Sequence, residues 1–342
     1  MSQSEKKVEE SVSIVLSERS SYEQTKAKPL AAQSARSAVV WTYILKASPS
    51  ARLNVSRSQN LAKTFRPLMR LPRFNLVGML RIVPLSLPLF LTTLTTPSLS
   101  AEAPTLSYEV VRKYPHDSSS FTQGLEMHQG RLYEGTGLRG RSALYCINLT
   151  TGKALNKVYL NPKYFGEGIT IYGDRLFQLT WTSGKAIVYR VRDFKPIGSY
   201  NYQGQGWGLT NDSKMLIMSN GSDSLFFRNP KSFEIEKTLQ VKDGEKKITQ
   251  LNELEWIKGN IWANIWGTNK IAIIDPSRGN VTAWLDLTDL LKQAIKKASS
   301  RPIDVMNGIA YREAKDTILV TGKFWPLLFE IKTESPTSPS PE

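Results

Sequence analysis

The fold is decided by Phe121-Thr-Gln-Gly-Leu125 and by four later stretches of the same pattern, in which small or polar residues precede an aliphatic residue. The later stretches are Phe165-Gly-Glu-Gly-Ile169, Gln205-Gly-Trp-Gly-Leu209, Leu251-Asn-Glu-Leu254 and Met306-Asn-Gly-Ile309. Recurrence at roughly 40–55 residues is typical of an architecture in which every repeat is one structural unit. We call these five stretches the openers.

Three β-rich runs follow the first opener, at Arg131–Tyr133, Ala143–Ile147 and Lys153–Leu160, and turn residues separate them. Similar runs follow the next three openers. The fifth unit lacks a fourth run, and the alternating segment Leu106–Tyr114 can supply it from the other end of the chain. The sequence therefore predicts an all-β, five-bladed β-propeller of four-stranded blades, with its ring closed by an N-terminal strand.

The interval between the fourth and fifth openers is longer than the others and contains a helical pattern. Apolar residues recur at helical spacing within Thr288–Ser299, so we expect one short inserted helix near residues 288–299. We expect the propeller to occupy residues 104–333. Residues 334–342, which are rich in Ser and Pro, are expected to form a disordered tail.

Residues 1–100 differ in composition from the rest of the chain, since they contain no Asp and only one of its 22 glycines. Through residue 101 the chain has 14 Lys and Arg against five Glu, which accounts for most of the net charge of +15. We expect residues 1–78 to be either a disordered targeting extension or a stretch upstream of the true start at Met79. Later basic residues are scattered among carboxylates, so we expect no nucleic-acid binding.

The segment from residue 79 to residue 103 has the order of a secretory signal. Basic residues precede an apolar run over residues 82–94, and small residues such as Ser100 and Ala101 follow it. The run is too short, and too interrupted by Pro84 and Pro88, for a stable membrane-spanning helix. A helix of the fold itself is the alternative interpretation. We expect the protein to be secreted or periplasmic.

In a propeller the first strand of every blade lines the central channel, so the variable side chains of the openers should meet in one cavity. Amide, carboxylate and indole groups are costly to bury without partners, and their presence here indicates a ligand site. The alternative is that they hydrogen-bond neighbouring blades. These side chains are Gln123, Glu167, Trp207, either Asn252 or Glu253, and Asn307.

Other motifs carry weaker signals. Gly135-Thr-Gly137-Leu-Arg-Gly140 matches a dinucleotide-binding pattern but leads into a predicted strand, where the pattern requires a helix. The two histidines, His116 and His128, are not spaced for a catalytic triad or for a zinc site. The single cysteine, Cys146, excludes an intrachain disulfide framework.

Six motifs follow one another along the predicted propeller. They are Phe121-Thr-Gln-Gly124, Phe165-Gly-Glu-Gly168, Leu251-Asn-Glu-Leu-Glu255, Ala263-Asn-Ile-Trp266, Asn307-Gly-Ile309 and Val320-Thr-Gly-Lys323-Phe-Trp-Pro326. Together they resemble the glutamine cyclotransferases of the papaya-latex type, from about Tyr108 to Ile331. The resemblance implies a five-bladed propeller that converts the N-terminal glutamine of peptides and proteins into pyroglutamate and releases ammonia. Arg139 departs from the family pattern, in which we expect an aromatic residue.

The resemblance also implies roles for individual residues. Glu167 is expected to carry a proton from the attacking amine to the departing ammonia, with Phe165 and Trp181 desolvating its carboxyl group. Lys323 and Asn252 are expected to act with it, either by donating hydrogen bonds to the oxyanion or by holding the substrate amide. The side chains expected to bind substrate are Phe121, Gln123, Phe165, Trp181, Trp207, Glu253, Trp266, Asn307 and Trp325.

Two other functions fit the same fold. A calcium-dependent propeller lactonase or esterase would gather Glu167, Glu253 and Asn307 around one ion, and a non-catalytic propeller would bind peptides at the channel mouth. We expect instead a monomeric acyltransferase that needs no cofactor and no catalytic metal. A structural calcium or other metal is compatible with the resemblance but is not predicted.

Overall fold

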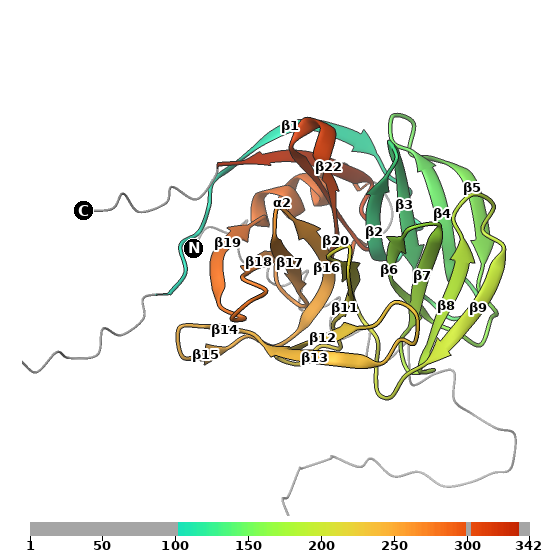
Figure 1. The fold of residues 1–342 in the computed structure, drawn as a ribbon. Helices are drawn as coiled ribbons and strands as arrows, with labels where there is room; N and C mark the ends of the chain where they lie inside the picture. The colour runs from blue at the N-terminus through green and yellow to red at the C-terminus, as the bar shows by residue number, and fades with distance from the viewer. Residues whose placement is uncertain (1–101, 299–301, 335–342) are drawn as a thin grey trace, which may run out of the picture. The chain divides into compact units, whose positions relative to one another are not determined.

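The computed structural model describes residues 102–298 and 302–334. The predicted extension (residues 1–78) lies outside the described residues, as do nearly all of the predicted signal segment and the predicted tail. Figure 1 shows the described strands as sheets arranged around a centre. Five of these sheets are antiparallel and four-stranded, so the predicted five-bladed propeller is confirmed.

The blades follow one another along the chain. Blade 1 contains β2 (Thr122–His128), β3 (Arg131–Thr136), β4 (Ala143–Asn148) and β5 (Lys153–Tyr159). Blade 2 contains β6 (Gly166–Tyr172), β7 (Arg175–Thr180), β8 (Lys185–Arg190) and β9 (Pro196–Asn201). Blade 3 contains β10 (Leu209–Asn211), β11 (Leu216–Met218), β12 (Ser224–Arg228) and β13 (Ile235–Gln240). Blade 4 contains β16 (Leu251–Ile257), β17 (Asn260–Ile265), β18 (Lys270–Ile274) and β19 (Val281–Asp286).

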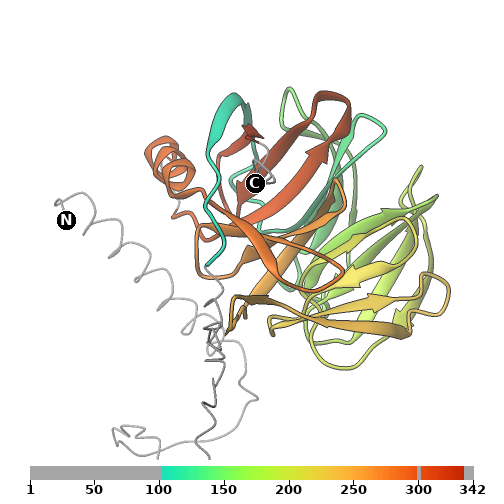
Figure 2. The same ribbon diagram turned by 60° about the vertical axis from the view of Figure 1, so that its left-hand side comes forward.

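Blade 5 joins the two ends of the described chain. Its strand order is β1 (Tyr108–Pro115), β22 (Leu327–Thr333), β21 (Thr317–Gly322) and β20 (Met306–Arg312), and the 3-10 turn η1 (Glu313–Lys315) links β20 to β21. Figure 2 shows β1 beside β22, with which it pairs antiparallel from Tyr108↔Thr333 to Pro115↔Leu327. Tyr114 on β1 also donates a hydrogen bond to the buried Glu330 carboxylate at 2.7 Å. The predicted closure by an N-terminal strand is therefore confirmed.

The recurring glycine of the openers is explained by the close approach of neighbouring first strands. A Cβ on Gly168 would lie 2.6 Å from the Leu209 nitrogen, and one on Gly208 would lie 1.9 Å from the Asn252 carbonyl oxygen. No side chain fits at such distances, because both obstacles are backbone atoms. The first strands of blades 2, 3 and 4 can therefore approach one another this closely because residues 168 and 208 are glycines.

The opener of blade 4 carries a glutamate at this position. Glu253 stands where the first three openers have glycine, and its carboxylate accepts hydrogen bonds from the backbone N–H groups of Leu125 (3.1 Å) and Ile309 (2.9 Å). It thereby ties the first strands of blades 1 and 5 to blade 4. Burial, reinforced by the nearby Glu255, raises the pKa of Glu253 well above its usual value.

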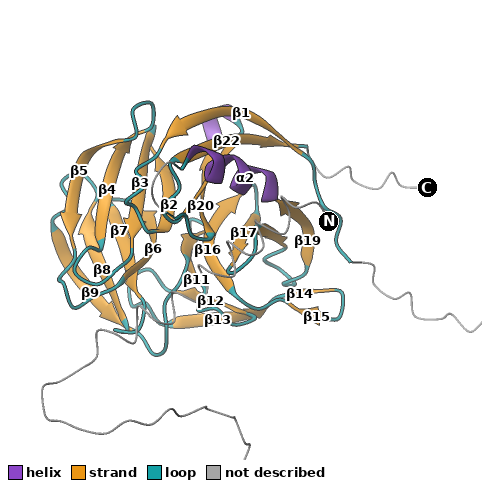
Figure 3. Ribbon diagram, turned by 180° about the vertical axis from the view of Figure 1, so that it is seen from behind, coloured by secondary structure: helices purple, strands orange, loops and turns teal. Residues whose placement is uncertain are grey.

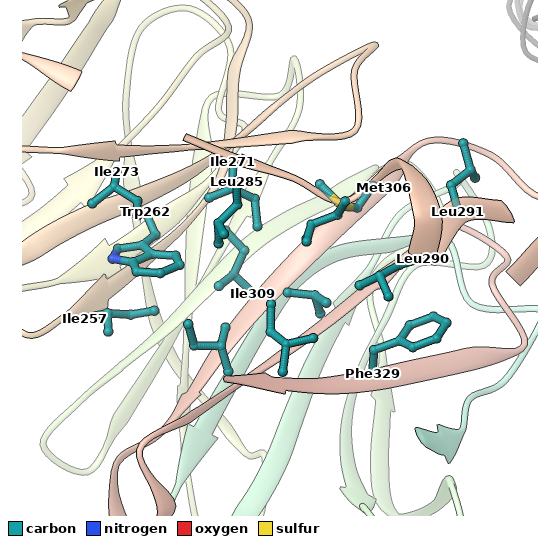
Figure 4. Close-up of a cluster of buried hydrophobic side chains, with 14 of the residues drawn as sticks. Ile257, Trp262, Ile271, Ile273, Leu285, Leu290, Leu291, Met306, Ile309 and Phe329 are labelled. Carbon is teal, nitrogen blue, oxygen red and sulfur yellow. The ribbon is translucent and has the colours of Figure 1, made fainter. Parts of the chain in front are cut away.

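The predicted helix is present as α2 (Thr288–Lys297), which ends two residues before the expected boundary. Its buried residues Leu290, Leu291 and Ala294 belong to a hydrophobic cluster shared with blades 4 and 5. Figure 4 shows Leu290 and Leu291 with Met306 and Phe329 of blade 5, and Figure 3 shows α2 in purple among the strands. The described residues contain no helix that is both long and apolar enough to cross a lipid bilayer.

The 3-10 turn η1 and one hairpin were not predicted. A short hairpin of β14 (Lys242–Asp243) and β15 (Lys246–Lys247) lies between blades 3 and 4 and is visible beside β19 in Figure 1. Its residues are mostly charged and lack the apolar alternation that identifies a strand in sequence.

Candidate active site

A cavity of about 660 Å³ opens among the first strands and the loops that precede and follow them. It is the size of a site for a small ligand or for one end of a peptide. Eight of the predicted site residues line it, namely Gln123, Phe165, Glu167, Trp181, Trp207, Asn252, Trp266 and Lys323.

Glu167 lies on β6 at the inner side of this cavity, and only 4% of its surface is exposed. Gln123 on β2 donates a hydrogen bond from Nε2 to Glu167 Oε1 at 2.9 Å. Asn307 on β20 in turn donates from Nδ2 to Gln123 Oε1 at 3.3 Å and to the Thr122 carbonyl at 3.0 Å. Three first strands thus contribute to one chain of amide hydrogen bonds that fixes the position of the Glu167 carboxyl group.

Lys323 follows β21 and brings a cation into the same cavity, although only 1% of its surface is exposed. Its Nζ lies 4.6 Å from the centre of the Phe121 ring, which is within the range of a cation–π interaction. Its backbone N–H donates to the Val305 carbonyl at 3.0 Å, and its carbonyl accepts from Asp304 at 2.9 Å. Both the main chain and the ammonium group of this lysine are therefore held in place.

Aromatic side chains form the walls of the cavity. Phe165 and Trp181 meet at 5.6 Å between ring centres, and Trp207 and Trp266 meet at 6.3 Å, both in edge-on geometry. Gln205 joins the two pairs, because its Oε1 accepts hydrogen bonds from the indole N–H groups of Trp181 (2.8 Å) and Trp207 (2.9 Å). One exposed amide thus orients two of the indoles that line the cavity.

Four predicted substrate-binding residues do not line the cavity. Phe121 contacts the cavity residue Phe165 edge-on, with 5.9 Å between the ring centres. Asn307 and Glu253 make the inter-strand hydrogen bonds described above. Trp325 is fully buried, donates from Nε1 to the Asp304 carbonyl at 2.8 Å and packs edge-on against Phe329. The motif around Lys323 thus supplies one cavity residue and one core residue.

Five further residues line the cavity without having been predicted. They are Gln205, Asn220, Gly221, Ser222 and Gln250. Gln205 belongs to the third opener, where it takes the place of the phenylalanine found in the first two, and that difference was an available signal. The others lie in loops between strands, where Asn, Gly, Ser and Gln are ordinary turn or surface residues and carry no sequence signal of binding.

A buried ion pair supports the turn that carries Lys323. His116 places Nε2 3.2 Å from Glu134 Oε1 and Nδ1 2.7 Å from the Trp325 carbonyl oxygen. Both ring nitrogens thus face acceptors, an arrangement that suits the doubly protonated imidazolium. Burial lowers the pKa of His116, but Glu134, the Trp325 carbonyl and the nearby Asp117 outweigh it, so the pKa is raised.

The described residues include no group of three or more His, Cys, Asp or Glu side chains placed to hold a metal ion. The cavity instead combines one carboxyl group, one ammonium group, several amides and aromatic walls. Such a set can bind a polar group with apolar neighbours, hold it in one orientation and transfer protons without a cofactor.

Comparison with known proteins places the chain in a family. The model of the glutamine cyclotransferase family matches residues 85–333. The chain is 37% identical over 235 residues to a glutaminyl-peptide cyclotransferase of Arabidopsis thaliana, which covers 68% of this chain and 73% of that protein. The crystal structure of Myxococcus xanthus glutaminyl cyclase is similar, with a TM-score of 0.64 and 34% identity over 68% of this chain and 99% of that one. The chain therefore belongs to the glutamine cyclotransferase family.

Proposed function

We propose that this protein is a glutaminyl-peptide cyclotransferase, which closes the N-terminal glutamine of a peptide into pyroglutamate and releases ammonia. The observation that carries the proposal is the position of Glu167. Its buried carboxyl group is fixed by Gln123 and faces the same aromatic-walled cavity as Lys323 and Asn252. We assign the reaction to the acyl transfers, because the glutamyl acyl group passes from one nitrogen to another.

The proposed reaction begins when the neutral α-amine of glutamine attacks its own side-chain amide carbon. A new C–N bond forms, and the carbonyl oxygen becomes an oxyanion. Glu167 removes a proton from the attacking nitrogen and delivers it to the amide nitrogen, after which the old C–N bond breaks and ammonia leaves. One carboxyl group can make both transfers, because it returns to its starting state after each turnover.

Lys323 and Asn252 supply the charge stabilisation that this intermediate requires. An ammonium group and an amide N–H both donate to a developing oxyanion, and they act strongly in a cavity from which water is excluded. Because Lys323 is anchored through its backbone and its ammonium group, its donor needs little reorganisation during the reaction. Asn252 is 2% exposed and lies on β16 of blade 4, whereas Glu167 lies on blade 2 and Lys323 follows β21 of blade 5.

The aromatic walls have a separate role, which is to fold the substrate. The attacking amine and the amide carbon belong to one flexible side chain, and a five-membered ring forms only if that side chain is curled. Phe165, Trp181, Trp207 and Trp266 present apolar surface to the glutamine methylenes, and the amide of Gln205 holds two of these indoles. We infer that these walls select the curled conformer.

The decisive test is ammonia release and a mass loss of one ammonia when the purified protein is mixed with a glutamine-initiated peptide. Glu167→Gln keeps the shape of the side chain and removes its proton-transfer ability, so we expect turnover to fall at least about a thousandfold. Circular dichroism checks that the variant is folded. A folded wild type that releases no ammonia but binds the peptide would instead favour a binding protein.

We also propose that the protein is exported and acts as a monomer on peptides. The support for export is the order of basic, apolar and small residues between residues 79 and 103. Mass spectrometry of the protein recovered from culture medium or periplasm would identify the mature N-terminus, and retention of residues 79–94 there would contradict export by cleavage. Light scattering would give the oligomeric state.

A further inference from the structure

A second cavity, of about 460 Å³, adjoins the first. The two cavities share Gln250 and Trp266 as lining residues, so one side chain of the aromatic wall faces both. The second cavity is otherwise formed by the β14–β15 hairpin, the ends of blade 4 strands and the segment that precedes β1. We call it the side groove.

Gln250 is held in an unusual backbone conformation at the junction of the two cavities. Its φ is 63°, in the left-handed region that is costly for a residue other than glycine. Its N–H donates to the Gly221 carbonyl at 2.8 Å, and its carbonyl accepts from Trp266 N–H at 2.9 Å. Backbone strain that is held by two hydrogen bonds is often found at binding sites, because it fixes the direction of a side chain.

Three lysines and two carboxylates, those of Glu102 and Asp243, line the side groove and give it a formal charge of +1. Lys246, Lys247 and Lys270 line it and are exposed, and Lys247 pairs with Asp223 at 3.1 Å. Within residues 102–298 and 302–334, no carboxylate lies at ion-pair distance from Lys246 or Lys270. Two ammonium groups therefore remain able to meet acidic groups of a ligand.

The two carboxylates that line the side groove, those of Asp243 and Glu102, differ in exposure and in their hydrogen bonds. Asp243 is 7% exposed, and its carboxylate already accepts hydrogen bonds from Ala103 N–H and from the Trp284 indole, both at 2.8 Å. These bonds attach the segment before β1 and orient Trp284 in the groove lining. Glu102 is exposed and is the first described residue of that segment.

We propose that the side groove binds the part of the peptide substrate that follows the N-terminal glutamine, with a preference for acidic side chains. This inference deepens the proposed function and depends on it for the identity of the bound chain. With glutamine in the first cavity, the chain must leave past its rim. An extended peptide advances about 3.3–3.6 Å per residue, so the residues after the second can pass Gln250 and Trp266 and enter the groove.

The test compares three substrates of the full-length protein. One is the dipeptide amide Gln-Ala, which is too short to fill the groove, and two are glutaminyl heptapeptides that carry either three Asp or three Lys at positions 3–5. We expect kcat/KM to favour the acidic heptapeptide about tenfold over the basic one, mainly through KM, and added salt to reduce the preference.

The informative variant is the double substitution Lys246→Glu and Lys270→Glu. We expect it to reverse the preference between the heptapeptides and to leave the dipeptide amide within about twofold of wild type. A matched control, Lys153→Glu with Lys214→Glu, makes the same change in net charge at exposed residues that line neither cavity. The control should keep the wild-type preference.

A binding measurement separates failure of this inference from failure of the proposed function. A fluorescent heptapeptide that begins with pyroglutamate and carries Asp at positions 3–5 cannot react, and the Lys246/Lys270 variant should bind it about tenfold more weakly than wild type does. If the preference and this affinity survive in the variant while ammonia is released, the groove proposal is wrong. If the affinity depends on the two lysines but no glutamine peptide releases ammonia, the groove stands and the cyclotransferase proposal falls.

Discussion

Replacing His116 by alanine should destabilise the protein strongly in mildly acidic buffer and much less in alkaline buffer. The substitution removes a buried partner of Glu134 and a donor to the Trp325 carbonyl. Breaking a buried ion pair from one side costs about 3–5 kcal/mol. Glu134 still accepts from the Thr122 hydroxyl at 2.7 Å and, more weakly, from Ser120 at 3.4 Å, so we expect the low end, about 3 kcal/mol.

The pH dependence follows from the raised pKa of His116. A histidine with a pKa above 6.5 in the folded state stabilises fully below pH 6.5, and the contribution disappears as the pH rises through the folded-state pKa. Urea unfolding followed by tryptophan fluorescence should therefore show the largest loss in the alanine variant near pH 6 and a smaller loss near pH 9. His128 is the matched control, since burial lowers its pKa and gives the opposite slope. A cost below about 1 kcal/mol at pH 6, or one that grows with pH, would refute this reasoning.

Two further predictions concern the ring and the cavity wall. Gly208→Ala places a methyl group 1.9 Å from the Asn252 carbonyl oxygen, so we expect a loss of about 3 kcal/mol in the free energy of unfolding, measured by denaturant titration. An unchanged midpoint would show that the first strands can separate. Gln205→Ala removes the acceptor that two indoles share, and should raise KM about tenfold with kcat nearly unchanged. The same substitution should shift the tryptophan fluorescence, and an equal loss in kcat would instead make Gln205 part of the chemistry.

The fold could be predicted from the sequence because its repeat is imposed by sterics. At Gly168 and Gly208 the close backbone of the neighbouring first strand leaves no room for a side chain. The spacing of such glycines along the chain therefore reveals the period of the blades. The closing strand was predictable by counting, since one blade lacked a member. The β14–β15 hairpin was not, because its lysines and acids follow neither the period of a strand nor that of a helix.

The residues of the candidate site could be predicted where a polar side chain lies on one of the repeating first strands, and less well where it lies in a loop. Glu167 stands out because a carboxyl group occupies the inner strand of a blade. Asn307 and Glu253 stand out in the same way, yet they join strands, because a buried polar group can be satisfied equally well by protein or by ligand. Gln250 carries no signal, since its position at the junction of two cavities depends on a backbone conformation that sequence does not reveal.

The pairing of β1 with β22 has a consequence for how the chain folds. These strands are separated by nearly the whole described sequence, so the last blade remains incomplete until the C-terminal residues have been synthesised. Contacts of such long sequence separation slow folding, because loop entropy is lost before the contact forms. A chain that completes its ring late stays unfolded for longer. Translocation through a membrane channel requires an unfolded polypeptide, so such a delay would suit that route.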